Sequence, residues 1–225
     1  MTVATTAGWI LAAYLAGSIP FAWLFARAKG VDIRRAGSGN VGATNVFRSV
    51  GPAWGVATLV GDALKGFLPA WAFPRLAAGL AGASAATWPH LGLFCGVAAV
   101  AGHTWPVTLR FRGGKGVATS LGALLGVAPA AAGLGVAVWV ALFAVLRYVS
   151  VASIGAAVAI PVAAWTLAAA RPGFDPVLPL VLTALGLLVV VRHRSNMVRL
   201  LAGTENRAGR RTAGGRVRAT GDTRP

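Results

Sequence analysis

Long apolar runs separated by short polar segments set the pattern of this chain. A membrane-spanning helix needs roughly 20 apolar residues, with about 17 to 25 tolerated. The runs that have or approach this length are residues 7–26, 52–73, 89–107, 117–128, 130–146, 151–169 and 177–191. They predict an all-α, polytopic membrane protein with seven transmembrane helices. The boundary between the fourth and fifth runs is open, because Pro129 could either separate two helices or kink one long helix.

The composition agrees with a lipid environment. Hydrophobic residues make up 56% of the 225 and charged residues only 12%, about half the roughly 25% of soluble domains. The formal net charge is +16. A nucleic-acid-binding protein would combine such a charge with a polar surface, whereas this chain combines it with apolar runs. We therefore expect membrane lipids around it and no nucleic acid.

The basic residues also predict the orientation, because Lys and Arg near the ends of spans stay cytoplasmic. With the N-terminus outside and seven crossings, 18 of the 21 basic residues lie on the cytoplasmic side. The C-terminus and the polar segments are then cytoplasmic too. We expect residues 1–205 to form one transmembrane domain and residues 206–225, with six arginines, to form a disordered tail on anionic headgroups.

Three polar segments, 32–51, 102–122 and 192–207, are the places where chemistry is expected. The first contains Gly37-x-Gly39-x-x-Gly42, the spacing of a dinucleotide-binding fingerprint. That fingerprint needs a preceding strand and an acid about 20 residues later. Here the glycines follow a membrane run, and Asp62 lies inside the next one. The dinucleotide interpretation therefore fails.

The physical reason for such glycines still applies, because they let backbone N–H groups approach an anion. Ser38, Asn40, Thr44 and Asn45 add neutral hydrogen-bonding groups, and Arg48 adds a planar guanidinium suited to phosphate. These residues favour a phosphate site. The alternative is a glycine-rich turn that caps the next helix.

The other two polar segments also suit anions. Gly113-Gly114-Lys115-Gly116 presents an ammonium at the start of a helix, where the dipole favours negative charge; the alternative is a basic loop that contacts lipid headgroups. His193, Asn196 and Arg199 are spaced i, i+3, i+6, so a helical continuation places them near one face.

The roles of three polar residues in the apolar runs stay open from sequence. His103 could be catalytic or structural. Asp62 and Lys65, spaced i, i+3 within a run, could be a neutralised brace or a support for the site.

Some chemistries lack their residues. The acids number five, no His-x4-Asp dyad follows any histidine, and no His, Cys and carboxylate cluster has metal-ligand spacing. We expect neither a metal nor a cofactor, and we expect a monomer. The site is cationic and poor in bases.

Five stretches, taken together, resemble the bacterial acyl-phosphate:glycerol-3-phosphate acyltransferases of the PlsY type. They are GSIPFAWLFA (17–26), GSGNVGATNVFRSVG (37–51), DALKG (62–66), GHTWPVTLRFRGGKGVAT (102–119) and RHRSNMVRLLAGTE (192–205). The resemblance implies a seven-helix enzyme of the bacterial cell membrane with its site on the cytoplasmic side. It would move a fatty acyl group from acyl phosphate to the sn-1 hydroxyl of glycerol 3-phosphate, giving lysophosphatidic acid and phosphate.

The resemblance also implies roles for individual residues. Those that would hold glycerol 3-phosphate are Ser38, Arg48, Lys115, His193 and Asn196. The loop that would hold the phosphate of the donor contains Gly39, Asn40, Gly42, Ala43, Thr44 and Asn45. Ser153 would lie near the acyl chain. The proton of the attacking hydroxyl would go to the donor's own phosphate or to His193.

A transporter of a phosphorylated metabolite is the competing interpretation. It too would need cations and broken helices, but transporters of this kind are usually built from internal repeats, which the sequence does not display. The polar segments also lie together on one predicted face, as an enzyme that uses a cytosolic substrate requires.

Overall fold

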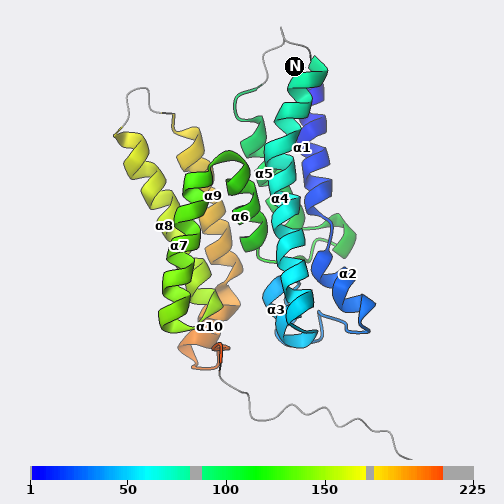
Figure 1. Cartoon of the computed structure of the whole chain (residues 1–225), viewed down its shortest axis with the longest axis vertical. Helices are drawn as coiled ribbons and strands as arrows, with labels where there is room; N and C mark the ends of the chain where they lie inside the picture. The colour runs from blue at the N-terminus through cyan, green and yellow to red at the C-terminus, as the bar shows by residue number, and fades with distance from the viewer. Residues whose placement is uncertain (1, 82–87, 171–174, 210–225) are drawn as a thin grey trace, which may run out of the picture.

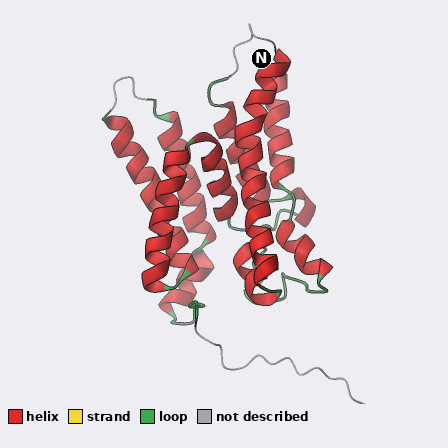
Figure 2. Cartoon of the chain, viewed as in Figure 1, coloured by secondary structure: helices red, strands yellow, loops and turns green. Residues whose placement is uncertain are grey.

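The computed structural model describes residues 2–81, 88–170 and 175–209, and these are helical or in connecting loops, with no strand among them (Figure 2). The helices are α1 Val3–Gly17, α2 Phe21–Ala28, α3 Ala43–Ser49, α4 Pro52–Ala81, α5 Leu91–Thr104, α6 Val117–Val127, α7 Pro129–Leu146, α8 Val149–Ala169, α9 Val177–Arg192 and α10 Arg194–Leu201, with a 3₁₀ turn, η1, at Val107–Leu109. The all-α prediction is confirmed for this part of the chain. The predicted tail lies outside the described residues from 210 onward.

Six of the seven apolar runs correspond to one helix each and the first corresponds to two, and not all of these helices are long. Four described segments are long and apolar enough to cross a membrane, and a fifth is reached if α9 and α10, bent by 51°, count as one span. The seven crossings and the orientation of the termini stay predictions. Pro129 does separate two helices: α6 ends at Val127, α7 begins at Pro129, and the chain turns back between them (Figure 1).

The first apolar run differs from its prediction as one continuous helix. It breaks between Gly17 and Phe21, because Pro20 has no N–H group to continue the helical ladder. The carbonyl of Ile19 at this break accepts a hydrogen bond of 2.7 Å from the Lys65 ammonium. The break therefore makes α2 a separate short helix, whose direction differs from that of α1 (Figure 1).

The helices form two groups joined by α6. Helices α1, α4 and α5 pack together on one side, α7, α8 and α9 on the other, and α6 contacts both α4 and α7 (Figure 1). Small residues allow these contacts, as is usual between membrane helices. A Cβ at Gly17 would overlap the backbone of Ala99, and one at Gly122 would overlap that of Ala63.

The short helices α2, α3 and α10 lie toward the end of the bundle opposite the N-terminus (Figure 1). The first and third polar segments adjoin or include these helices, whereas the second connects α5 to α6 through η1. The fold therefore gathers segments that are up to 160 positions apart in sequence, about the separation of residues 37 and 196, at one end of the molecule.

Candidate anion-binding active site

Lys115 belongs to a hydrogen-bonded group that three distant segments form, with Glu205 at its centre. Its ammonium donates to Oδ1 of Asn196. Nδ2 of Asn196 in turn donates to Oε1 of Glu205 at 2.6 Å. Glu205 also accepts from Arg199 Nε at 2.7 Å and from the Ser150 hydroxyl at 2.9 Å. The carboxylate thus fixes which way the Asn196 amide faces, so that the amide oxygen points at the lysine.

The bend between α9 and α10 places His193 and Asn196 in this group. His193 is the residue at the bend, and both its side chain and that of Asn196 are buried. Nδ1 of His193 lies 2.8 Å from the Val189 carbonyl oxygen. Because a carbonyl can only accept, Nδ1 carries the proton, and Nε2 is left as the acceptor nitrogen of the ring.

The charges around Lys115 are mostly positive. Burial lowers the pKa of Lys115 to about 8; the Glu205 carboxylate opposes this shift, and the guanidiniums of Arg199, Arg48 and Arg192 add to it. Burial alone would raise the pKa of Glu205, but its hydrogen bonds from Asn196, Arg199 and Ser150 lower it below its ordinary value. The site therefore holds an ionised acid and an excess of cations.

Not all of these cations are free to bind a ligand. Arg199 is ion-paired with Glu205, and Arg192 donates to the carbonyl oxygens of Gly113 and Gly114. Arg48, on α3, is exposed and has no hydrogen-bond partner among the described residues. Arg48 interacts electrostatically with the carboxylate of Glu205 and with the guanidinium of Arg199. Among these four described cations, Arg48 and Lys115 are therefore the two that are neither ion-paired nor bound to backbone carbonyls.

The glycine-rich loop before α3 is held in shape by one buried side chain, Asn45. Its Nδ2 lies 3.2, 3.0 and 3.0 Å from the carbonyl oxygens of Ile33, Ala36 and Asn40. Its Oδ1 accepts from the backbone N–H of Ser38 at 3.0 Å. The side chain of Asn45 is thus engaged within the loop and holds the shape of its backbone.

Three features of the loop and of the start of α3 suit an anion. Gly37 and Gly39 have positive φ angles of 56° and 69°, which a glycine adopts at no steric cost. The backbone N–H groups of Ala43 and Thr44 have no acceptor among the described residues. The Ser38 hydroxyl is exposed and likewise has no partner in the described part of the chain.

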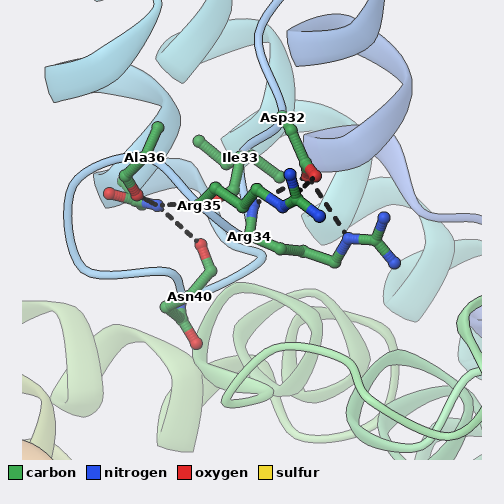
Figure 3. Close-up of polar contacts among 7 residues, drawn as sticks. Asp32, Ile33, Arg34, Arg35, Ala36 and Asn40 are labelled. Atoms are coloured by element: carbon green, nitrogen blue, oxygen red, sulfur yellow. Dashed lines mark hydrogen bonds and ion pairs between the residues drawn. The ribbon is translucent and has the colours of Figure 1, made fainter.

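The segment before this loop carries a local charge cluster (Figure 3). The carboxylate of Asp32 lies 3.3 Å from Arg34 Nε and 3.6 Å from Arg35 Nε. The hydrogen bond from the Arg34 backbone N–H is the main cause that lowers the pKa of Asp32. These groups are exposed, so the cluster is a surface feature of the segment rather than part of the Lys115 group.

The polar residues inside the helices form a separate buried group. Lys65 Nζ lies 2.7 Å from Asp62 Oδ1, and His103 Nδ1 lies 3.5 Å from the same oxygen. The side chains of all three are buried. Asp62 and Lys65 therefore form a buried ion pair, and the ring of His103 lies close to the backbone of Gly114. The role of this group, as a brace or as a support for the site, stays a prediction.

Ser153 lies on α8, about one helical turn after Ser150, and its hydroxyl is engaged within the helix group of α7 and α8. Its hydroxyl donates to the Val149 carbonyl oxygen at 2.8 Å and accepts from Trp139 Nε1 at 3.1 Å. The contact with an acyl chain stays a prediction. Among the described residues, no group of three or more His, Cys, Asp and Glu could hold a metal ion.

The structure thus brings Arg48, Lys115, His193 and Asn196 to one end of the bundle, and it leaves Ser38 on the neighbouring loop without a contact to Lys115 or Asn196 among the hydrogen bonds described. Sequence reasoning did not single out Glu205, Ser150 or Arg192. A clue to Glu205 existed, because it is the only carboxylate in the third polar segment. Ser150 and Arg192 make tertiary contacts that no local sequence pattern predicts.

Comparison with known proteins gives one consistent family. Residues 7–203 match the profile of the glycerol-3-phosphate acyltransferases. The chain is 47% identical over 195 residues to the glycerol-3-phosphate acyltransferase of Desulforudis audaxviator, covering 86% of this chain and 91% of that one. It is 45% identical over 195 residues to that of Geobacter sulfurreducens, covering 87% and 93% of the two chains.

Solved structures agree with the sequences. The chain is similar to a crystal structure of PlsY (YgiH), an integral membrane glycerol 3-phosphate acyltransferase, in its glycerol 3-phosphate form. The TM-score is 0.79 and the identity 40%, over 91% of this chain and 96% of that one. The lysophosphatidic acid form of PlsY gives a TM-score of 0.76 at 39% identity, over 90% and 95%.

Proposed function

The chain belongs to the glycerol-3-phosphate acyltransferase family and is a membrane acyltransferase, and we propose that it uses acyl phosphate as donor. The acceptor is the sn-1 hydroxyl of glycerol 3-phosphate, and the products are lysophosphatidic acid and inorganic phosphate. The observation that carries the proposal is the pair of available cations, Arg48 and Lys115, beside His193 and Asn196. This arrangement suits an acceptor with a phosphate at one end and hydroxyls at the other.

The acceptor's phosphate binds Arg48 and Lys115 in this proposal. Two cations match a phosphate that carries nearly two negative charges, and the Arg48 guanidinium can bind two oxygens at once. The Ser38 hydroxyl adds a neutral hydrogen bond from the neighbouring loop. His193 Nε2 and the Asn196 amide lie beside Lys115, where they orient the hydroxyl that reacts.

The donor's phosphate binds along residues 39–45. Here Gly39 and Gly42 let the backbone come close, and the N–H groups of Ala43 and Thr44 point to the oxygens. The Asn40 side chain lies on this loop, and the Thr44 side chain lies in the first turn of α3. Asn45 contributes by holding the loop's shape through its own carbonyl contacts. The acyl chain extends from the phosphate into the membrane, and Ser153 is the residue proposed near it.

The reaction needs little acid–base help from the protein. The sn-1 oxygen attacks the acyl carbon, the bond from that carbon to the phosphate oxygen breaks, and inorganic phosphate leaves. The hydroxyl proton passes to an oxygen of the leaving phosphate. Lys115, Arg48 and the loop N–H groups stabilise the charge that develops, and holding both substrates in one site supplies proximity. No metal or cofactor takes part.

The topology belongs to the same proposal. Seven helices cross the bacterial inner membrane, the N-terminus lies outside and the site faces the cytoplasm, as the distribution of basic residues supports. Residues 1–205 form one domain, residues 206–225 form a cytoplasmic tail, and the protein acts as a monomer surrounded by membrane lipids.

Turnover by the purified protein tests the proposal directly. Palmitoyl phosphate and labelled glycerol 3-phosphate should give labelled lysophosphatidic acid and one equivalent of phosphate. Equal activity with palmitoyl coenzyme A would overturn the choice of donor. Uptake of glycerol 3-phosphate into proteoliposomes without any lysophosphatidic acid would favour the transporter instead.

A further inference from the structure

Arg192, the last residue of α9, grips the backbone that precedes Lys115. Its Nε lies 3.2 Å from the Gly114 carbonyl oxygen, and its Nη2 lies 3.1 and 2.9 Å from those of Gly113 and Gly114. These contacts span 78 and 79 positions of sequence. They join the helix group of α7, α8 and α9 to the segment that enters α6.

The segment that Arg192 binds, Gly113-Gly114, has no side chains and is held through its backbone alone. On its other edge, the N–H of Gly113 donates to the Thr104 carbonyl and that of Gly114 to the His103 carbonyl, each at 3.1 Å. A Cβ at either glycine would overlap His103, so only glycine allows the segment to lie this close to α5. One edge is therefore held by α5 and the opposite edge by Arg192.

The same corner of the molecule also holds the lysine side chain. Arg192 is followed directly by His193, and Asn196, one helical turn later, accepts the hydrogen bond from the Lys115 ammonium. The junction of α9 and α10 thus binds both the backbone before Lys115, through Arg192, and the end of the Lys115 side chain, through Asn196. Because its guanidinium donates hydrogen bonds to two backbone carbonyl oxygens, Arg192 binds the protein itself and is not a ligand for a substrate phosphate.

We propose that Arg192 is a positioning residue of the acyltransferase, which sets the place of Lys115 relative to His193 and Asn196. The inference rests on the proposed function of that site. A misplacement of about 1 Å can lower the rate about a hundredfold, so losing the grip should lower turnover itself. A planar guanidinium can serve two carbonyls at fixed spacing, whereas an ammonium is a compact charge that can hold only part of this geometry.

Arg192→Gln, Arg192→Lys and a matched control, Arg194→Gln, form the test. Arg194 is two positions away, exposed and without a hydrogen bond or ion pair among the described residues. Each full-length variant is purified and assayed with palmitoyl phosphate and glycerol 3-phosphate, and its melting temperature is measured. Amide hydrogen exchange is followed in parallel by mass spectrometry, on peptides that cover residues 110–117.

Arg192→Gln should lower kcat about a hundredfold and should speed exchange at residues 113–115 at least about tenfold, because a loosened loop opens more often. Arg192→Lys should recover part of both, and Arg194→Gln should match the wild type in both. Wild-type exchange and kcat in Arg192→Gln would overturn the proposal. So would a raised KM with unchanged kcat and exchange, which is the signature of a substrate ligand.

The two readouts separate this proposal from the function on which it rests. Exchange does not depend on turnover, so a wild-type protein that forms no lysophosphatidic acid refutes the function while the exchange comparison still decides the role of Arg192. If Arg192→Gln unfolds, Arg192→Lys carries the test, because a folded Lys variant with wild-type kcat and exchange also overturns it.

Discussion

The ammonium of Lys115 donates a hydrogen bond to Oδ1 of Asn196, 81 positions further along the chain. The amide is held in this orientation by the 2.6 Å hydrogen bond from its Nδ2 to Glu205. An ammonium has three hydrogens, so one contact to the protein leaves two for a ligand. The hydrogen bond to the neutral amide therefore orients the Lys115 ammonium without neutralising its charge. The predictions for the site depend on this orientation.

Replacing Lys115 by alanine should abolish most turnover without unfolding the protein. The variant loses one of the two cations available to the substrates, and removing one preorganised group of this kind costs about 100- to 1,000-fold in rate. The measurement is kcat/KM for lysophosphatidic acid formation, together with the melting temperature in detergent. A well-folded Lys115→Ala protein with activity within a few-fold of wild type would remove Lys115 from the site.

The activity should fall as the pH rises above about 8. Because burial and neighbouring cations lower the pKa of Lys115 to about 8, the neutral amine appears at a lower pH than for an ordinary lysine. Only the charged form attracts the substrate phosphate. The pH profile of kcat/KM reports groups of the free enzyme, so it should lose about tenfold per pH unit well above this value.

Lys115→Arg provides the control for that pH profile, since a guanidinium stays charged throughout. Whatever activity this variant keeps should lack the decline near pH 8. A decline at the same pH in Lys115→Arg would assign it to a different group.

His193→Gln should separate orientation from base catalysis. The Nδ1 proton is donated to Val189, so Nε2 is the nitrogen that faces a ligand, and a glutamine can replace its hydrogen bond but not accept the proton. If the leaving phosphate takes the proton, the variant should show a raised KM for glycerol 3-phosphate and a kcat within a few-fold of wild type. A kcat that falls by several orders of magnitude, with loss of the acidic limb of its pH profile, would make His193 the base.

Glu205→Gln should weaken both the fold of this region and the activity. The carboxylate accepts hydrogen bonds from Ser150, Asn196 and Arg199, and hydrogen bonds to charged groups contribute about 1.5–3 kcal/mol each. A glutamine has one oxygen and one amino group in their place, so at least one donor loses its acceptor. We expect a lower melting temperature and a lower kcat/KM.

The pH dependence of stability gives a second measurement for Glu205. Its pKa is lower in the folded protein than in the unfolded chain, so its contribution is complete above the unfolded value and is lost as the pH falls through the folded value. The difference between wild type and Glu205→Gln should therefore shrink in acid. Asp32→Asn, which changes an exposed ion pair, should melt like the wild type; an equal loss in both variants would contradict a special role for Glu205.

The sequence allowed the helical architecture to be predicted, and it pointed to the polar segments that the structure brings together, for identifiable reasons. Apolar runs reveal helices because lipid demands them, and the glycines and cations of the polar segments stand out against an apolar background. What could not be predicted depends on contacts that only the folded chain makes, within a loop as well as across the bundle. In sequence, the amide of Asn45 has the chemistry of a phosphate ligand; its contacts with three carbonyls of its own loop are visible only in the structure.

Glu205 and Arg192 are the opposite case, because the sequence did not single them out and the structure places them beside Lys115 and Asn196. In sequence, Arg192 is one of several arginines at the end of a span, where membrane topology alone explains a positive charge. Only the approach of residues 113–114 to α9 reveals its role. Similarly, the break at Pro20 could be foreseen from proline's missing N–H, but not that Lys65 would cover the carbonyl of Ile19.

A matched pair of glycines tests the packing on which the site depends. Gly122, on α6, lies against the backbone of Ala63 on α4, and an added Cβ would overlap it; Gly133, on α7, has open space at the same position. Backbone cannot move aside as a side chain can, and overpacking typically costs about 1–3 kcal/mol. Gly122→Ala should therefore lower the melting temperature and, since α6 begins just after Lys115, also kcat.

The control, Gly133→Ala, should instead gain about 0.5–1 kcal/mol of stability, because alanine favours the helix, and should keep its activity. Thermal unfolding in detergent, with turnover measured on the same samples, checks both, and equal melting temperatures for the two variants would contradict the close approach of α4 and α6.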